Sequence, residues 1–175
     1  AEVILAGYTI VYRDHEPVKI GLAGINQGII TDEACARAIA AMMRFRNTID
    51  AYGVTTVLAF GTSALRSATN AEVLTSQIKV KTGIDVSVIS GDEEADLIFD
   101  GIRAAMHLGD GKSLVIDIGA GSVEFIIGDA TRVDWKQSFE IGGQRLLEKF
   151  QKHDPITRAE ISALDAYFDL TLRPL

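Results

Sequence analysis

The sequence is poor in cysteine, in basic residues and in long apolar runs, and each shortage excludes a class of protein. Its 175 residues include a single cysteine, Cys35, so no disulfide can form within the chain, as is typical of a reducing compartment. No apolar run approaches the roughly 20 residues of a membrane-spanning helix. No N-terminal stretch combines a basic start with an apolar run and a cleavage site. We therefore expect a soluble, cytoplasmic protein with no membrane partner.

The shortage of basic residues also limits the partners. Lys and Arg number 17 against 24 Asp and Glu, which gives a net charge of −7. This balance argues against nucleic-acid binding by a broad positive surface. An anionic ligand has to be held locally instead, by backbone N–H groups, a few Arg or Lys, or a metal. Hydrophobic residues make up 47% of the chain, so it can bury a core, and its length allows one large domain or two small ones.

Strand and helix patterns alternate along the first part of the chain, which predicts an α/β fold with parallel strands. Thr31 has the residue type and position of a helix N-cap, and Gly53 is placed to end that helix. The predicted helices span residues 31–52, 71–82 and about 92–107, the predicted strands residues 54–60 and 84–90, and the predicted loop residues 61–70.

After the turn "GDGK", a strand pattern restarts at Ser113. Two apolar, β-branched runs with "GAGS" between them predict a hairpin over 113–129, followed by a third strand and two helices. Because this pattern follows a complete α/β series, we predict a domain boundary there, with domains at 1–112 and 113–175.

The predicted hairpin carries two acidic residues that a plain hairpin does not need. Asp117 lies inside the first run and Glu124 just after the turn. A turn containing Gly119 and Gly121 can direct several N–H groups at one point and so bind an anion, and the Ser122 hydroxyl adds a donor. A carboxylate at a strand end can bind Mg²⁺. The alternative is a tight turn with two solvated acids.

A second polar stretch, "FGTSALRSATN", follows a predicted strand and precedes a predicted helix. Ligands commonly bind at such junctions in α/β proteins. Ser63 offers a hydroxyl, and Arg66 offers a guanidinium suited to phosphate. The alternative is a capped loop with a surface arginine.

A third stretch, "VISGDEEADLIF", places three acids at the start of a predicted helix. Acidic residues there complement the helix dipole, which is the simpler interpretation. The functional interpretation is that one of these carboxylates faces a crevice and acts as a general base.

Taken together and in this order, the three stretches closely resemble the exopolyphosphatase and guanosine pentaphosphate phosphatase family (Ppx/GppA). "GTSALRSATN", "VISGDEEADLIFDGI" and "VIDIGAGSVEFIIGD" carry the resemblance, and "WKQSFEIGGQRLLEKF" fits the segment that follows. It covers about residues 16–150. It implies the actin-like, sugar-kinase and Hsp70-like ATPase fold, in which two ribonuclease-H-like domains face each other over a phosphate cleft.

The resemblance also assigns roles to individual residues. It places the catalytic glutamate, which activates water for attack on a terminal phosphoryl group, at Glu94. It places the divalent cation, expected to be Mg²⁺, at Asp117 and Glu124. The phosphate-binding residues that it implies are Ser63, Arg66, Gly119, Ala120, Gly121 and Ser122.

Three departures from the family pattern set further expectations. The first strand of the family, with its Asp-Ile-Gly-Ser-Asn-Ser-like loop, is not found in the chain. The central loop usually reads DIGGGS, and here Ala120 replaces the middle glycine. The chain also stops partway through the second domain. We therefore expect a domain that lacks its first strand plus the start of a second, a chain with little hydrolase activity by itself, and a homodimer.

The expected activity is release of terminal phosphate from inorganic polyphosphate or from guanosine pentaphosphate. Two alternatives remain open. One is a phosphotransferase of the same superfamily, such as a small-molecule kinase. The other is a non-catalytic module that senses a nucleotide or phosphate.

Overall fold

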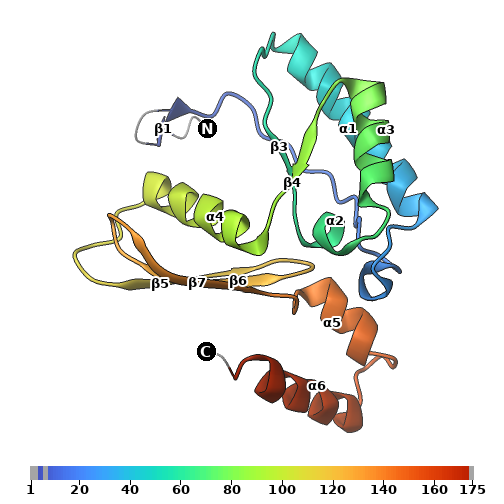
Figure 1. Ribbon diagram of the computed structural model, residues 1–175, viewed down its shortest axis with the longest axis vertical. Helices are drawn as coiled ribbons and strands as arrows, with labels where there is room; N and C mark the ends of the chain where they lie inside the picture. Colours follow the sequence, from blue (N-terminus) through green and yellow to red (C-terminus); the bar gives the residue numbers. More distant parts are fainter. Residues whose placement is uncertain (1–3, 6–7, 174–175) are drawn as a thin grey trace.

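The computed structural model describes residues 4–5 and 8–173 and shows a mixed α/β architecture (Figure 1). Near the N-terminus, β1 (Ile4–Leu5) and β2 (Tyr8–Thr9) form an antiparallel pair. The remaining elements form two units. The first unit contains β3, β4 and α1 to α3, and the second contains α4 to α6 and β5 to β7.

The first unit is built on two parallel strands, β3 (Ala59–Gly61) and β4 (Val86–Val88). Helices α1 (Asp32–Ala51) and α3 (Ala71–Thr82) lie side by side against them (Figure 1). The Thr31 hydroxyl accepts from the N–H of Ala34, as the sequence predicts for an N-cap. The side chains that form the core include Ile30, Ala34, Leu74, Ile78 and Ile84, all buried.

Two predictions for this unit are wrong. The strand expected over 54–60 is confined to 59–61, because only these residues lie beside β4 and gain backbone partners. The expected loop over 61–70 contains a short helix, α2 (Ser63–Ser67), whose first hydrogen bond joins the Arg66 N–H to the Thr62 carbonyl at 2.8 Å. Leu65 anchors this turn of helix in the core.

The second unit is built on an antiparallel sheet in the order β5–β6–β7, formed by Ser113–Ile118, Val123–Gly128 and Val133–Phe139. This confirms the predicted hairpin and third strand. Helix α4 (Gly91–Ala105) covers one face, where Ala95 and Phe99 pack on Ile126. Helices α5 (Gly143–Phe150) and α6 (Arg158–Thr171) contribute to a second cluster around Phe139.

Helix α4 joins the two units. It follows β4 of the first unit directly but packs on the sheet of the second (Figure 1). A Cβ added at Gly91 would lie 2.5 Å from the Cβ of Ser138, so the glycine allows the start of α4 to approach β7 closely. The predicted domain boundary at 112/113 stays a prediction.

Candidate active site

A cleft of about 190 Å³ lies where the two units meet. Its lining comes from four segments that are far apart in the sequence, and Ile25 and Gln144 complete it. These segments are residues 19–21, residues 62–64, Glu94 at the start of α4, and residues 119–122 between β5 and β6. The three stretches that the sequence singled out therefore face one cavity.

The turn at residues 119–122 presents free backbone N–H groups. The Gly119 N–H donates to the Ser122 carbonyl at 3.0 Å. Within the described residues, the N–H groups of 120, 121 and 122 donate no hydrogen bond. The turn carbonyls face the other way, because those of 119, 120 and 121 accept from the first N–H groups of α5 and the residue before it. The turn therefore has the polarity that an anion requires.

Ala120 fits this turn without strain. Among the described residues, the non-glycine residues with a positive φ are Lys19 and Ala23. Ala120 therefore has an ordinary backbone conformation, which any L-residue adopts, and the family's middle glycine is not required there.

Asp117, Glu124 and Ser138 lie in one row across the sheet. The ladder pairs Asp117 with Glu124 and Glu124 with Ser138, and side chains of such cross-strand partners share a face. Glu124 is 1% exposed, and its Oε1 accepts from the Ser138 hydroxyl at 2.6 Å. Burial raises the pKa of Glu124, hydrogen bonds from Ser138 and Ser122 oppose this, and the nearby charges of Glu94 and Asp117 add to it. Two carboxylates thus lie side by side near the turn.

Glu94 occupies the first turn of α4 and lines the cleft. Ser90 and Glu93 form a capping box at the start of this helix. The Glu94 carboxylate accepts from Nη1 of Arg66 at 3.0 Å across the junction between the units. Of the three acids at the helix start, Glu94 is the one that faces the cavity.

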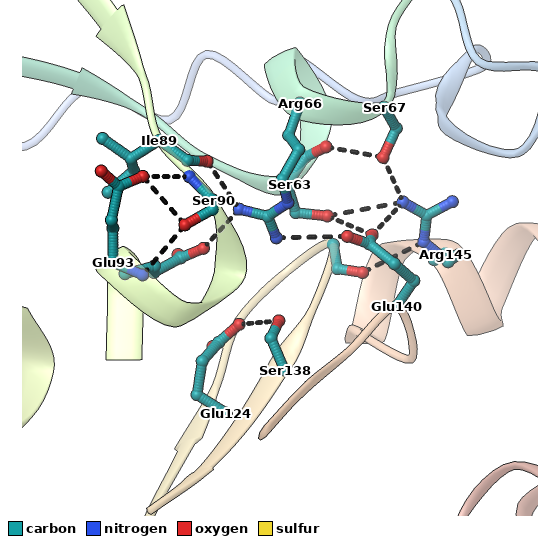
Figure 2. A network of polar contacts seen from close by, with 12 residues as sticks. Ser63, Arg66, Ser67, Ile89, Ser90, Glu93, Glu124, Ser138, Glu140 and Arg145 are labelled. Carbon is teal, nitrogen blue, oxygen red and sulfur yellow. Dashed lines mark hydrogen bonds and ion pairs between the residues drawn. The ribbon is translucent and has the colours of Figure 1, made fainter. Parts of the chain in front are cut away.

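Ser63 lines the cleft but Arg66 does not. The Ser63 hydroxyl donates to Glu140 Oε2 at 2.5 Å. Arg66 donates from Nη1 to Glu94 and to the Ile89 carbonyl, and from Nη2 to Glu140 (Figure 2). Arg66 therefore contacts Glu94, which lines the cleft, without lining the cleft itself. Its predicted contact with phosphate stays a prediction.

The sequence did not single out Glu140, Arg145 or Lys19. Arg145 is placed among segments from both units, with Nε donating to the Gly121 carbonyl at 3.1 Å and Nη1 to the Ile25 carbonyl at 3.1 Å. The only signal for Glu140 and Arg145 was a strand–glycine–helix pattern in "FEIGGQR". Lys19, which lines the cavity with φ of 51°, had no signal.

The donor set suits a hard cation. Within residues 4–5 and 8–173, no three His, Cys, Asp or Glu side chains form a complete metal-binding group. Mg²⁺, however, is commonly bound by one or two protein carboxylates, with water and substrate phosphates completing its shell. Asp117, which is exposed, and its neighbour Glu124 match that pattern.

No helix in the described part of the chain is both long and apolar enough to cross a bilayer.

Comparison with known proteins identifies the family. The Ppx/GppA phosphatase family matches residues 2–175. A bifunctional 3-dehydroquinate synthase/phosphatase of Fusobacterium nucleatum is 35% identical over 144 residues, which cover 80% of this chain and 22% of that protein. A guanosine-5'-triphosphate,3'-diphosphate pyrophosphatase of Photobacterium profundum is 36% identical over 146 residues, 82% of this chain and 29% of that protein.

A solved structure agrees with these matches. The crystal structure of an exopolyphosphatase from Cytophaga hutchinsonii has a TM-score of 0.91 and 47% identity, and the match covers 95% of this chain and 53% of that one. The chain therefore corresponds to part of the length of each of these proteins. Its motifs, its α/β fold and these matches agree, and the chain belongs to the Ppx/GppA phosphatase family.

Proposed function

We propose that the protein is a phosphohydrolase that releases terminal phosphate from inorganic polyphosphate or guanosine pentaphosphate. The observation that carries the proposal is that Glu94 and the free N–H groups of the 119–122 turn line the same cleft. Phosphoryl transfer depends mainly on positioning and on stabilising charge on the phosphoryl oxygens. A carboxylate facing preorganised N–H donors supplies both requirements.

Each residue has a distinct task in this proposal. The N–H groups of Ala120, Gly121 and Ser122 hold the terminal phosphoryl oxygens. Glu94 accepts a proton from the attacking water. Lys19, which lines the cleft, supplies a positive charge that attracts the polyanionic remainder of the substrate. Names of related proteins support the two substrate classes, since they include an exopolyphosphatase and a pentaphosphate pyrophosphatase.

A divalent cation belongs to the same proposal. Asp117 and Glu124 would hold Mg²⁺, which would neutralise charge on the phosphoryl oxygens. The hydroxyl of Ser138 donates to Oε1 of Glu124 and favours the ionised carboxylate that a cation requires. A homodimer and a cytoplasmic location also remain proposals.

Phosphate release by the full-length protein tests the function. The protein is incubated with Mg²⁺ and either medium-chain polyphosphate or guanosine pentaphosphate, with no acceptor other than water. We expect orthophosphate from at least one substrate. Phosphate transfer that needs an added alcohol or nucleotide acceptor would indicate a kinase, and tight binding of both substrates without turnover would indicate a sensing module.

A further inference from the structure

Four side chains of alternating charge form a continuous chain beside the cleft, in the order Arg145, Glu140, Arg66, Glu94. Arg145 Nη2 donates to Glu140 Oε2 at 2.5 Å, Arg66 Nη2 to Glu140 Oε1 at 3.1 Å, and Arg66 Nη1 to Glu94 Oε2 at 3.0 Å (Figure 2). Its last member is the proposed general base. The other three do not line the cleft.

This chain crosses the junction between the two units more than once. Arg66 belongs to α2 of the first unit and bonds to Glu94 and Glu140 of the second. Arg145 belongs to α5 of the second unit and donates to the Ser67 hydroxyl of the first at 3.0 Å. The Ser63 hydroxyl, from the first unit, also donates a hydrogen bond to Glu140. Glu140 is thus a carboxylate on which donors from both units converge.

The two arginines and Glu94 are more buried than the partners of ordinary surface ion pairs, with side chains that are 12% (Arg145), 21% (Arg66) and 15% (Glu94) exposed. The Glu140 side chain is 42% exposed, so the weight of its contacts lies in the two partly buried guanidinium groups that it engages. Exposed pairs contribute little because water and salt screen them, whereas a partly buried arginine left without its carboxylate carries an uncompensated charge. Both oxygens of Glu140 are engaged, one by each arginine, so its loss would remove a carboxylate partner from two guanidinium groups at once.

The orientation of Arg66 depends on Glu140. Its guanidinium is planar and is fixed at three acceptors: the Ile89 carbonyl, Glu94 and Glu140. Without Glu140, Nη2 has no acceptor in this arrangement, and Arg66 can turn and take the Glu94 carboxylate with it. A displacement of about 1 Å in a catalytic group can cost on the order of 10²-fold in rate.

We infer that Glu140 is a positioning residue, which acts through Arg66 to fix Glu94 at the cleft and through Arg145 to hold the two units together. This inference rests on the proposed function, because it gives Glu94 a catalytic task. Glu140 itself contacts neither substrate nor reacting atoms. Its role predicts a loss of turnover without a matching loss of substrate binding.

The test compares Glu140→Gln with a matched control, Asp134→Asn, in the full-length protein. Asp134 also pairs with two cations, Lys112 and Arg132, but within the second unit, outside the cleft and its hydrogen-bonded network. We expect Glu140→Gln to lower kcat for polyphosphate about 10-fold with KM changed less than about 2-fold. We expect Asp134→Asn to match the wild type. Arg66→Lys keeps the charge but loses the planar guanidinium with its several donors, and it is expected to resemble Glu140→Gln. The double variant is expected to be no slower than the slower single variant.

A second measurement does not depend on activity. Hydrogen exchange is followed by mass spectrometry in residues 62–67 and 91–95, the segments that Arg66 connects. Glu140→Gln is expected to accelerate exchange in both segments about 10-fold, whereas Asp134→Asn is expected to leave them unchanged.

These readouts separate the inference from the proposed function. Unchanged exchange in Glu140→Gln would overturn the inference, whatever the activity. A raised KM with wild-type kcat would overturn it as well, because Arg66 would then be a phosphate ligand. A markedly lowered KM in Glu140→Gln would also overturn the inference, because it would show that Glu140 competes with the substrate for Arg66 and Arg145 in the wild type. If the wild type releases no phosphate, the proposed function fails, and the exchange data still decide whether Glu140 fixes the start of α4.

Discussion

The turn at residues 119–122 and the junction around Glu140 lie side by side at the cleft but are encoded differently. The turn is encoded mainly locally: its glycines and its flanking strands lie within the 17 residues of "SLVIDIGAGSVEFIIGD", although its carbonyls accept from the start of α5. The junction is not, because Glu140 meets Arg66 and Ser63 across separations of 74 and 77 residues. The turn can therefore be recognised from sequence, whereas the junction becomes visible only in the fold.

The two regions are therefore expected to respond differently to mutation. The turn is flanked by its own strand ladder, so a change there that leaves the contact between Gly121 and Ser63 intact is expected to alter ligand binding before it alters folding. The junction depends on the exact approach of two units, so a change there is expected to alter their relative positions and the groups they align.

Glu94→Gln is expected to lower turnover by about 10² or more, the effect of losing a general base, with substrate binding largely kept. Glu93→Gln is the matched control. Glu93 is exposed, and glutamine can still complete the capping box, so its turnover is expected to stay near that of the wild type. Steady-state kinetics of both variants gives the comparison. Equal turnover in the two variants would remove the catalytic role of Glu94.

Gly121→Ala tests the close approach of the turn to the first unit. A Cβ there would lie 2.5 Å from the Ser63 hydroxyl oxygen and 2.8 Å from the Ser63 Cβ, so the units must separate slightly. We expect a loss of about 1–3 kcal/mol in the free energy of unfolding, measured in urea. Gly101→Ala is the control, because an added Cβ at Gly101, inside α4, meets nothing within 4 Å and is expected to stabilise the helix. Equal stability of Gly121→Ala and the wild type would show that the units do not pack as described.

Asp117→Asn tests the turn region alone. Because Asp117 is exposed and contributes no core contact, thermal stability is expected to stay near that of the wild type. The Mg²⁺ concentration for half-maximal activity is expected to rise about 10-fold or more, as for the loss of a group that supports a metal. Activity titrated with Mg²⁺ and a thermal melt give the two readouts. A collapse of thermal stability with unchanged Mg²⁺ dependence would make Asp117 structural.

Substitution of Glu160 is expected to have the smallest effect, on stability at low pH. Its hydrogen-bond partners Thr157 and His153 are close to it in the sequence. Hydrogen bonds, first from the Thr157 N–H and then from His153, lower the pKa of Glu160 to about 2. Because this pKa is lower in the folded state than in the unfolded state, the stabilisation is present above about pH 5 and is lost as pH falls toward 2. We expect the melting temperature of Glu160→Gln to fall less than that of the wild type over this interval. Parallel melting curves for the two proteins would contradict the assignment.

Sequence reasoning succeeded where the signal was short-range. The cap at Thr31 and the hairpin at 113–129 depend on neighbours within a few residues, and the structure contains both. The family resemblance then predicted that three distant stretches face one cleft, and they do.

Sequence reasoning failed where tertiary partners decide the outcome. The strand expected over 54–60 is short because a strand requires a neighbour, which no local pattern reveals. Helix α2 was missed because its stability comes from Leu65 in the core. No local pattern indicated that Glu140 would engage Arg66 from 74 residues away, and the predicted contact of Arg66 with phosphate stays a prediction.

The most direct test of the central claim, that Glu94 directs water at the terminal phosphoryl group held by the turn, is an isotope experiment. The full-length protein hydrolyses polyphosphate or guanosine pentaphosphate in ¹⁸O-labelled water with Mg²⁺, and the products are analysed by mass spectrometry. The account predicts one solvent oxygen in each released orthophosphate, none in the remaining chain or nucleotide, and loss of labelled phosphate in Glu94→Gln. Label in the remaining chain or nucleotide, or undiminished labelled phosphate from Glu94→Gln, would contradict it.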